Sequence, residues 1–306
     1  MNEIAAATAA LARGELVIMP TETVYGLAAD ARNPAAVARV FEAKGRPRFN
    51  PLIAHVPDLA AAMKIAELPS LGVTLAQAFW PGPLTLIGKA RPGGACDLAR
   101  GGLDSVAVRV PDHPVALALL QAFGGPVAAP SANRSGRPSP TRMRDALEET
   151  GGSAALALEG GDCRVGLEST VVSLLGERPA ILRAGGLTRG ELISVVGELE
   201  EAPADALRSP GRLALHYAPD APVRLNARSP EPGEAFLAFG PNAPQGERVW
   251  NLSVTADLRE AAARLFACLR EADRTRPTAI AVAPVPHHGL GEAINDRLRR
   301  AAGYRG

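Results

Sequence analysis

The stretch Leu16-Val17-Ile18-Met19-Pro20-Thr21-Glu22-Thr23-Val24-Tyr25-Gly26 joins a short apolar run to a polar string that ends in glycine. The run Leu16–Met19 follows Gly14, and a short run of apolar residues bounded in this way is typical of a buried strand. This strand leads directly into the string Pro20–Gly26, so the hydroxyl groups of the string come to the end of a buried element. Ligand pockets usually form at such places.

Three further strings have the same character. Each lies where a hydrophobic stretch ends in glycine or proline, and they are Lys44–Pro47, Pro130–Asn133 and Gly166–Val172. Together with Pro20–Gly26 they bring hydroxyls, an amide and two fixed positive charges to the ends of buried elements. Such a collection predicts an anionic and polar ligand.

The length and composition predict a globular protein with two domains. The chain has 306 residues, whereas domains usually contain ~100 to 200. Hydrophobic residues make up 47% and charged residues 21%, and no apolar run approaches the ~20 residues that a membrane span requires. The N-terminus has no basic region ahead of an apolar stretch, so we expect a cytoplasmic protein with no membrane partner.

Cysteine spacing and net charge exclude other classes of protein. Three widely separated cysteines without a Cys-x-x-Cys pair argue against a disulfide framework and a structural zinc site, so no metal ligands are assigned. A net charge of +1 argues against non-specific nucleic-acid binding as the main activity. Only three of the 33 basic residues are lysines, so Lys44 suggests a site that needs a compact ammonium group.

The first two thirds of the chain alternate helical and strand-like patterns. A helix is predicted at Pro34–Ala43, and Gly45 is suited to the left-handed residue that ends it. Thr188 and Glu191 have the spacing of a capping box that opens another helix, ending near Gly197. Strand-like stretches lie at Leu52–His55, Thr85–Ala90, Ser105–Val110, Val127–Ala129, Ala155–Leu158, Ser169–Leu175 and Ile181–Arg183.

The composition changes near Glu198, and Ser209–Pro219 is typical of a linker. Beyond it we expect strands and helices in the alternation of a small parallel α/β domain. The strands are Val223–Leu225, Ala235–Phe239, Val249–Leu252 and Ala279–Ala283, and the helices are Asp257–Ala272 and Gly291–Ala302. In the first of these helices Leu265 and Leu269 belong to an apolar stripe, and Arg270 is expected to point elsewhere. The domains are therefore predicted at 1–207 and 221–306, with a linker or lid at 208–220.

The strand at Ser105–Val110 makes a geometric prediction. Alternation places Val106, Val108 and Val110 toward the core, and Arg109 on the opposite face with Ser105 and Ala107. An arginine with small neighbours is open to a carboxylate or phosphate that binds it through two hydrogen bonds. The alternative is an arginine on a solvated outer face, and the strand taken alone favours that alternative.

The other strings also have ordinary explanations when each is taken alone. The basic residues of Lys44–Pro47 complement a helix dipole, and Pro130–Asn133 has the composition of a turn. Ser169 and Thr170 are suited to opening a β-branched strand. The absence of Gly-x-Ser-x-Gly argues against a Ser-His-Asp hydrolase, and without a Walker loop any ATP must be held differently.

As an ordered set, the strings resemble the YrdC family of threonylcarbamoyl-AMP synthases. The matching blocks are Pro20–Gly26, Lys44–Pro51, Ser105–Pro111, Pro130–Asn133, Gly166–Val172 and Leu182–Arg183. The linker, with Gly289–Gly291 and Asn295–Ala302, resembles the longer, two-domain branch of the family. The resemblance implies an α/β fold: an N-terminal twisted, open, mixed sheet with helices and a concave pocket, and a small Rossmann-like α/β C-terminal domain.

The resemblance implies a nucleotidyltransferase that condenses L-threonine, bicarbonate and ATP into threonylcarbamoyl-adenylate and pyrophosphate. Mg²⁺ is expected to arrive with ATP, bridging phosphate oxygens. The product would pass to a separate tRNA threonylcarbamoyl transferase, which modifies the adenosine beside the anticodon of certain tRNAs. Direct binding of tRNA to this chain is expected to be weak.

The resemblance also implies the site residues. Lys44 and Arg46 are the catalytic pair, at a helix end that we expect to be exposed. The L-threonine site is expected to contain Thr23, His55, Arg109, Ala129 and Ser169. The ATP site is expected to contain Lys44, Arg46, Asn50, Ser105, Ser131, Asn133, Ser139, Arg183 and Tyr217. His216 and Tyr217 are expected to fold over the nucleotide as a lid that excludes water.

Two other classes of function stay open at this point. One is a module that binds double-stranded RNA or the ribosome, for which an open sheet with a basic concave face would suffice. The other is a carbamoyl-transfer domain of hydrogenase maturation, although the zinc-finger and acylphosphatase-like segments expected before it are missing. Threonine-dependent release of pyrophosphate from ATP distinguishes the synthase from both.

Overall fold

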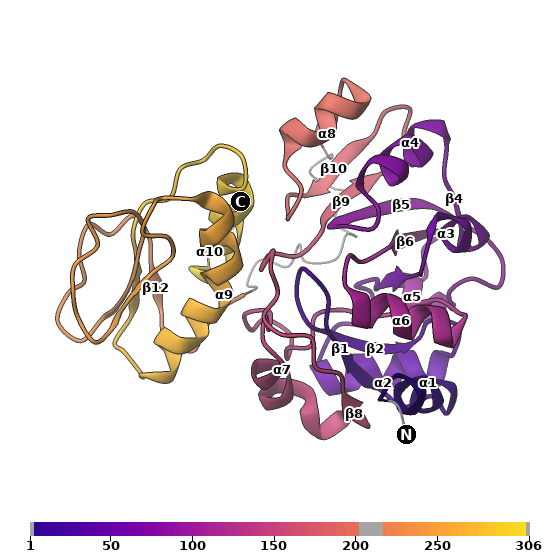
Figure 1. Cartoon of the computed structure of the whole chain (residues 1–306), viewed down its shortest axis with the longest axis horizontal. Helices are drawn as coiled ribbons and strands as arrows, with labels where there is room; N and C mark the ends of the chain where they lie inside the picture. Colours follow the sequence, from indigo (N-terminus) through magenta and orange to yellow (C-terminus); the bar gives the residue numbers. More distant parts are fainter. Residues whose placement is uncertain (1–2, 202–216, 304–306) are drawn as a thin grey trace.

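Strands and helices alternate along the chain and form two sheets, each with its own helices (Figure 1). The computed structural model describes residues 3–201 and 217–303. Within these residues, no helix combines the length and the apolar character that a membrane crossing needs. The predicted linker falls largely outside the described residues, as does His216.

The larger sheet is mixed, as predicted. Its strands are β1 (Val17–Met19), β2 (Gly26–Asp30), β3 (Ile53–His55), β4 (Ala66–Glu67), β5 (Leu84–Ala90), β6 (Ser105–Arg109), β7 (Val127–Ala128), β8 (Leu156–Ala157), β9 (Thr170–Ser173), β10 (Ala180–Arg183) and β11 (Glu200–Glu201). Their spatial order is β11-β10-β9-β5-β6-β3-β7-β2-β1-β8, with β4 beside β5. At its centre β5 runs parallel to β9 and antiparallel to β6.

Helices cover this sheet through separate apolar clusters. They are α1 (Glu3–Ala12), α2 (Pro34–Lys44), α3 (Leu59–Ile65), α4 (Ser70–Phe79), α5 (Asp97–Arg100), α6 (Pro114–Phe123), α7 (Met143–Thr150) and α8 (Arg189–Val196), with a 3₁₀ turn at Gly151–Ser153. Helices α3, α4 and α8 pack with β5, β6 and β9, whereas α1 and α6 pack with β1 and β7. The N-terminal part therefore has a continuous framework from which the connecting strings project.

Two local predictions about helix ends are confirmed. Helix α2 ends at Gly45, whose φ of 58° lies in the left-handed region that favours glycine. The Thr188 side chain accepts a hydrogen bond from the Glu191 amide, and the Glu191 carboxylate accepts one from the Thr188 amide. This reciprocal pair is the predicted capping box at the start of α8.

Strand β6 has the predicted alternation. Val106, Val108 and Val110 lie in the core with α3 and α4, and Ala107 lies on the opposite face in a second apolar cluster. Arg109 is only 3% exposed. The alternative of a solvated outer face is therefore wrong, because the other face of β6 is also covered.

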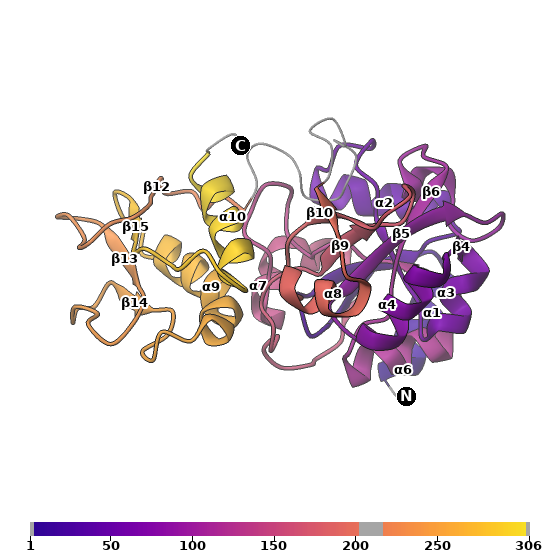
Figure 2. The same ribbon diagram turned by 90° about the horizontal axis from the view of Figure 1, so that it is seen from above.

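The second sheet is parallel throughout its described strands. They are β12 (Val223–Arg224), β13 (Ala235–Ala238), β14 (Val249–Asn251) and β15 (Ile280–Val282), in the order β12-β15-β13-β14. Figures 1 and 2 show α9 (Leu258–Arg274) and α10 (Gly291–Ala301) between this sheet and the N-terminal part. Both helices pack on the same face of the sheet, because they share one apolar cluster with it.

The two parts of the chain share a core at the signature strings. Val24 and Leu167 belong to the apolar cluster of α9 and α10. At Gly166, with φ of 72°, a Cβ atom would lie 2.4 Å from the Cα atom of Ala263 in α9, so only glycine permits this approach. The backbone of α9 therefore lies directly against the string Gly166–Val172.

Arg270 lies off the apolar stripe of α9, as expected, but it is nonetheless buried. Arg270 is 6% exposed, and its Nη1 atom lies 3.0 Å from Oε1 of Glu149. It also donates a hydrogen bond to the carbonyl oxygen of Pro138. The reason is that α9 is buried on two sides, by its own sheet and by α7 of the N-terminal part, a contact that helical periodicity does not reveal.

Candidate active site

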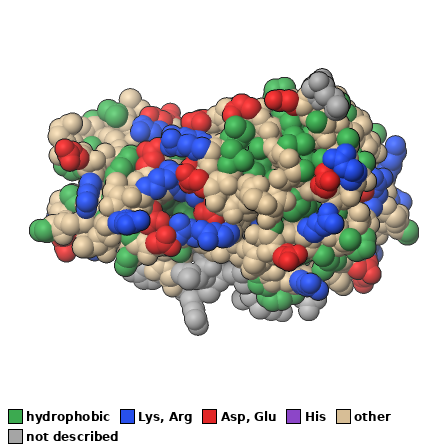
Figure 3. Space-filling view, turned by 90° about the horizontal axis from the view of Figure 1, so that it is seen from below, with side chains coloured by type: hydrophobic (Ala, Val, Ile, Leu, Met, Phe, Trp, Pro, Cys, Tyr) green, Lys and Arg blue, Asp and Glu red, His purple; other side chains and the backbone are tan. Residues whose placement is uncertain are grey.

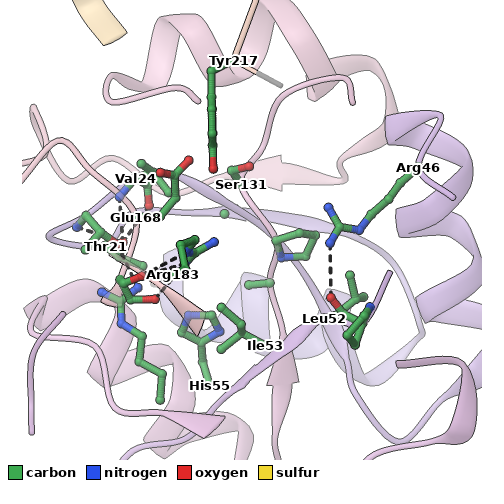
Figure 4. A pocket seen from close by; sticks show the side chains of 17 residues that line it. Thr21, Val24, Arg46, Leu52, Ile53, His55, Ser131, Glu168, Arg183 and Tyr217 are labelled. Atoms are coloured by element: carbon green, nitrogen blue, oxygen red, sulfur yellow. Dashed lines mark hydrogen bonds between the residues drawn. The ribbon is translucent and has the colours of Figure 1, made fainter. Parts of the chain in front are cut away.

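The four signature strings meet around one pocket, which is lined by 17 residues (Figure 4). They reach it from the β1–β2 loop, the segment after α2, and the turns that follow β7 and precede β9. Nine of the predicted site residues line it, namely Thr23, Arg46, His55, Arg109, Ala129, Ser131, Ser169, Arg183 and Tyr217. The pocket therefore contains every residue predicted for L-threonine and four of those predicted for ATP.

Arg109 forms a buried ion pair with Glu22. Its Nη2 atom lies 2.6 Å from Oε1 of Glu22, whose side chain is 0% exposed, although the two atoms lack hydrogen-bond alignment. The guanidinium group also donates to Oγ1 of Thr23 at 2.8 Å and to the carbonyl oxygen of Gly82 at 3.2 Å. The guanidinium group of Arg109, which we expected to be free for a ligand, is thus largely occupied by groups of the chain itself. It also orients the hydroxyl of Thr23 in the pocket wall.

Hydroxyl groups form pairs on the pocket wall. Oγ1 of Thr21 lies 2.8 Å from Oγ1 of Thr23 and donates to the Val24 carbonyl oxygen at 2.6 Å. Oγ of Ser169 lies 2.7 Å from Oγ1 of Thr85 on β5. Because each hydroxyl has a fixed neighbour, its remaining hydrogen-bonding capacity points in a defined direction.

His55 is a neutral imidazole at physiological pH. Burial, followed by the positive charge of Arg109, lowers its pKa to about 3. Its Nδ1 atom is buried and has no hydrogen-bond partner among the described residues. The ring therefore lines the pocket without adding a charge to it.

Two arginines supply positive charge. Arg46 donates to the carbonyl oxygen of Pro51 at 3.2 Å, and burial lowers its pKa to about 10, which leaves it charged. Arg183 donates to the carbonyl oxygen of Ser169 at 2.8 Å and to the Ser169 hydroxyl at 3.2 Å. Figure 4 shows Arg46 across the pocket from Thr21 and Glu168, whereas Arg183 lies on the same side as these two residues, so the two arginines face the cavity from different sides.

Lys44 is buried, so the expectation of an exposed helix end is wrong for this residue. It is 2% exposed, and its Nζ atom donates to the carbonyl oxygens of Ser131 and Asn133. Burial, followed by the charge of Arg46, lowers its pKa well below the ordinary value. The turn Pro130–Asn133 covers the helix end, and Lys44 holds this turn instead of lining the pocket.

Four other predicted residues lie outside the pocket lining. Ser105 begins β6, at the opposite end of the strand from Arg109. Asn50 is buried, and its Oδ1 atom has no partner among the described residues. Asn133 donates to the carbonyl oxygens of Arg134 and Arg137, and Ser139 donates to Glu168 at 2.5 Å.

Tyr217 closes one side of the pocket. It is 1% exposed, and Figure 4 shows its hydroxyl pointing into the cavity. Its ring stacks on Phe266 of α9 with centroids 5.3 Å apart, and its φ is 65°. Burial, followed by the charge of Glu168, raises its pKa to about 12.

Glu168 and Glu22 line or support the pocket but were given no role from the sequence. Glu168 lines it, and Glu22 supports Arg109 from behind. Both stand inside signature strings, so a signal was present, but a glutamate gives no periodicity that predicts burial. Arg297, which binds Glu168, lies 129 positions away, and no pattern in the sequence joins the two.

Two family models match the chain in succession. The model Sua5_yciO_yrdC, described as telomere recombination, matches residues 9–185, and the model of the threonylcarbamoyl-AMP synthase C-terminal domain matches residues 187–303. The threonylcarbamoyl-AMP synthase of Pyrococcus abyssi is 41% identical over 95% of this chain and 92% of its own length. That of Bacillus subtilis is 39% identical over 99% of this chain and 94% of its own length.

The fold agrees with these sequence matches. The crystal structure of P. abyssi Sua5 complexed with L-threonine superposes with a TM-score of 0.91 and 40% sequence identity, covering 99% of this chain and 95% of that one. Both parts of the molecule are therefore present in a solved relative. The chain belongs to the threonylcarbamoyl-AMP synthase family, in its two-domain form.

Proposed function

We propose that the chain is a nucleotidyltransferase that converts L-threonine, bicarbonate and ATP into threonylcarbamoyl-adenylate, pyrophosphate and water. The observation that carries this proposal is the composition of the pocket, in which neutral hydrogen-bonding groups and fixed cations face one cavity. Its relatives carry the name of this synthase, and the P. abyssi structure is described as a complex with L-threonine. The geometry suits an amino acid beside a nucleotide.

L-Threonine is assigned to the side of the pocket formed by Thr23, His55, Arg109, Ala129 and Ser169. The carboxylate of L-threonine would lie in the positive field of Arg109. The hydroxyls of Thr23 and Ser169, each held by a neighbour in the chain, would contact the other polar groups of L-threonine. The His55 ring and the carbonyl oxygen of Ala129 supply further contacts. A neutral imidazole suits this place, because it adds no positive charge that would repel the amine.

ATP is assigned to the side that carries Arg46, Ser131, Arg183 and Tyr217. Arg46 is the cation placed for the triphosphate, and Lys44 fixes the turn that presents Ser131. Asn50, Ser105, Asn133 and Ser139 stay assigned to the nucleotide as supports behind the lining. No three His, Cys, Asp or Glu side chains converge on a metal position within the described ranges, and Mg²⁺ is proposed as part of the ATP substrate, bridging phosphate oxygens.

The reaction needs positioning more than covalent catalysis. The threonine amine and bicarbonate form a carbamate with loss of water, a carbamate oxygen bonds to the α-phosphorus, and the bond to pyrophosphate breaks. Holding the two reactants in contact supplies ~7 to 11 kcal/mol of the barrier in favourable cases. The half-buried Arg46 and Arg183 stabilise the negative charge that develops on the leaving group, and Tyr217 helps to exclude water.

The product is proposed to pass, in the cytoplasm, to a tRNA threonylcarbamoyl transferase, with at most weak direct contact between this chain and tRNA. Basic and acidic side chains are interspersed on the face in Figure 3. Such a face lacks the continuous positive surface that supports strong non-specific RNA binding. The synthase is therefore favoured over the RNA-binding alternative.

The proposal is tested by pyrophosphate release. Release should require ATP, L-threonine and bicarbonate together, and Arg46→Gln should reduce it by on the order of 100-fold or more, because a charge contact to a developing anion is lost. Lys64→Gln, on the exposed side of α3, is the matched control and should leave the rate unchanged. Release that proceeds equally without threonine contradicts the proposal.

A further inference from the structure

Arg297 of α10 reaches to the back of the pocket from the second part of the chain, which consists of the parallel sheet β12–β15 with α9 and α10. The residue is 0% exposed. Its Nε atom donates to Oε2 of Glu168 at 2.9 Å, and its Nη2 atom donates to the carbonyl oxygen of Ala184 at 2.9 Å. Its Nη1 atom donates to Asp296 at 2.7 Å, so the planar group is held on all sides. An arginine buried in this way has a fixed position from which it can orient others.

Glu168 is the first residue that Arg297 orients. Glu168 lines the pocket, and its two carboxylate oxygens are held separately, Oε1 by the Ser139 hydroxyl at 2.5 Å and Oε2 by Arg297. Burial alone would raise its pKa, but Arg297 and Arg183 lower it to about 2. Glu168 therefore stays ionised and is too weak a base to remove a proton. What Arg297 controls is the orientation of the Glu168 carboxylate.

Tyr217 is the second residue in contact with Arg297. The Cζ atom of Arg297 lies 5.2 Å from the centroid of the Tyr217 ring, within the range of a cation–π contact. Phe266 of α9 stacks on the same ring. The positive φ of Tyr217 is uncommon for a bulky residue, and these contacts stabilise it. The second part of the chain thus fixes the aromatic wall of the pocket.

A backbone contact at Gly166 also joins the two parts of the chain. Because α9 lies directly against Gly166, the string that carries Glu168 is packed against the second part. Leu167 is buried in the same core as α9 and α10. The distance between Arg297 and Glu168 is therefore set by packing on both sides.

We propose that Arg297 is a positioning residue of the active site, which orients Glu168 and Tyr217 so that the second part of the chain shapes the nucleotide side of the pocket. This inference rests on the proposed function for the identity of the nucleotide. It assigns the C-terminal part a direct role in the site, in addition to any role in anchoring the linker.

The experiment compares Arg297→Lys with two controls in the full chain. Lysine keeps the charge but lacks the planar fork, so it cannot make the contacts with Glu168, Ala184 and Tyr217 together. The kcat/KM for ATP should fall on the order of 100-fold, as expected when a pocket wall is misplaced. Arg299→Gln, exposed on the same helix, should have no effect. Phe236→Leu, in the apolar cluster on the far face of the second sheet, should lower Tm without changing kcat/KM.

A double-mutant cycle tests the route through Glu168 and avoids an unpaired buried charge. Arg297→Met, Glu168→Gln and the double variant should show strongly non-additive losses in kcat/KM for ATP, with the double variant no worse than Arg297→Met. Losses that multiply, or an Arg297→Lys variant that behaves like Phe236→Leu, would overturn the inference. If the wild-type protein showed no threonine-dependent pyrophosphate release, the proposed function would be contradicted instead. The contact between Arg297 and Glu168 could then still be tested, because the Tm changes of the two single variants would not add up to that of the double variant.

Discussion

The buried pair Glu22–Arg109 leads to a quantitative prediction about stability. The two charged atoms lie 2.6 Å apart, and the side chains are 0% and 4% exposed, respectively. At an effective dielectric constant of ~20, their attraction is about 6 kcal/mol, which is offset in part by the desolvation of both groups. Removing one partner of such a pair typically costs ~3 to 5 kcal/mol, because the other charge is left buried.

Arg109→Met should therefore lower the free energy of unfolding by ~4 kcal/mol, a large part of the ~5 to 15 kcal/mol that stabilises a typical protein. The Arg109→Met/Glu22→Gln double variant should recover at least ~2 kcal/mol of this loss, since no unpaired charge remains. Arg109→Lys should lower the free energy of unfolding by only ~1 to 2 kcal/mol. The loss is small because the positive charge is retained, and it comes from the missing hydrogen bonds to Thr23 and Gly82.

The assay is urea unfolding followed by tryptophan fluorescence. The chain has two tryptophans, so a Trp250→Phe background leaves Trp80 as the reporter in the N-terminal part. All variants and the reference protein share this background. A coupling energy below ~0.5 kcal/mol between Arg109 and Glu22 would refute the buried ion pair as a support of the pocket.

Three further predictions concern pH, specificity and water exclusion. His55 has a pKa of ~6.5 in the unfolded chain and about 3 in the folded chain. Between these pH values the unfolded chain binds more protons, so the free energy of unfolding falls as the pH is lowered. Relative to His55→Asn, the wild-type protein should lose about 2 kcal/mol of unfolding free energy between pH 7 and 5, and equal pH profiles would contradict the neutral buried imidazole. The kcat/KM for L-threonine should exceed that for L-serine by ~10- to 200-fold. L-Valine should be a worse substrate than L-serine, because it leaves the buried partners of the hydroxyl unpaired. Equal use of valine and serine would show that no hydroxyl is recognised. Tyr217→Ala should raise ATP hydrolysis relative to adenylate captured, measured by chromatography of AMP, pyrophosphate and product, and an unchanged ratio would remove Tyr217 from water exclusion.

Local patterns predicted much of the fold. The helix predicted at Pro34–Ala43 with its stop at Gly45, the capping box at Thr188 and the alternation of β6 all depend on neighbours within a few residues. The parallel second sheet followed from alternation of strands and helices. Such features are encoded by residues close together in sequence, so periodicity and capping rules find them.

The contacts between the two parts of the chain were not predictable in this way. Arg270 lies off the apolar stripe of its helix, as expected, but the pattern of that helix does not reveal that α7 buries it. Lys44 was expected at an open helix end, yet the turn Pro130–Asn133 covers it. In each case the partner lies about 90 to 120 positions away.

The candidate site shows the same division. The signature strings contribute part of the pocket lining, because polar residues at the ends of buried strands converge there, but Lys44 and Asn133 of the same strings lie outside it. They did not predict that Arg109 is held by Glu22, or that Glu168 is held by Arg297. Those supporting contacts require the three-dimensional arrangement, since a buried glutamate or arginine has no periodic signature of its own.

If one pocket joins threonine, bicarbonate and the AMP group of ATP, all three must be found in one product, and an isotope label shows this most directly. The protein is incubated with ¹³C-labelled bicarbonate, L-threonine and ATP with Mg²⁺, and the nucleotide products are separated and weighed by mass spectrometry. We expect a single adenylate that contains one labelled carbon, one threonine and one AMP, formed in equal amount with pyrophosphate. An adenylate of threonine that lacks the labelled carbon, or release of pyrophosphate with AMP alone in the presence of all three substrates, would contradict it.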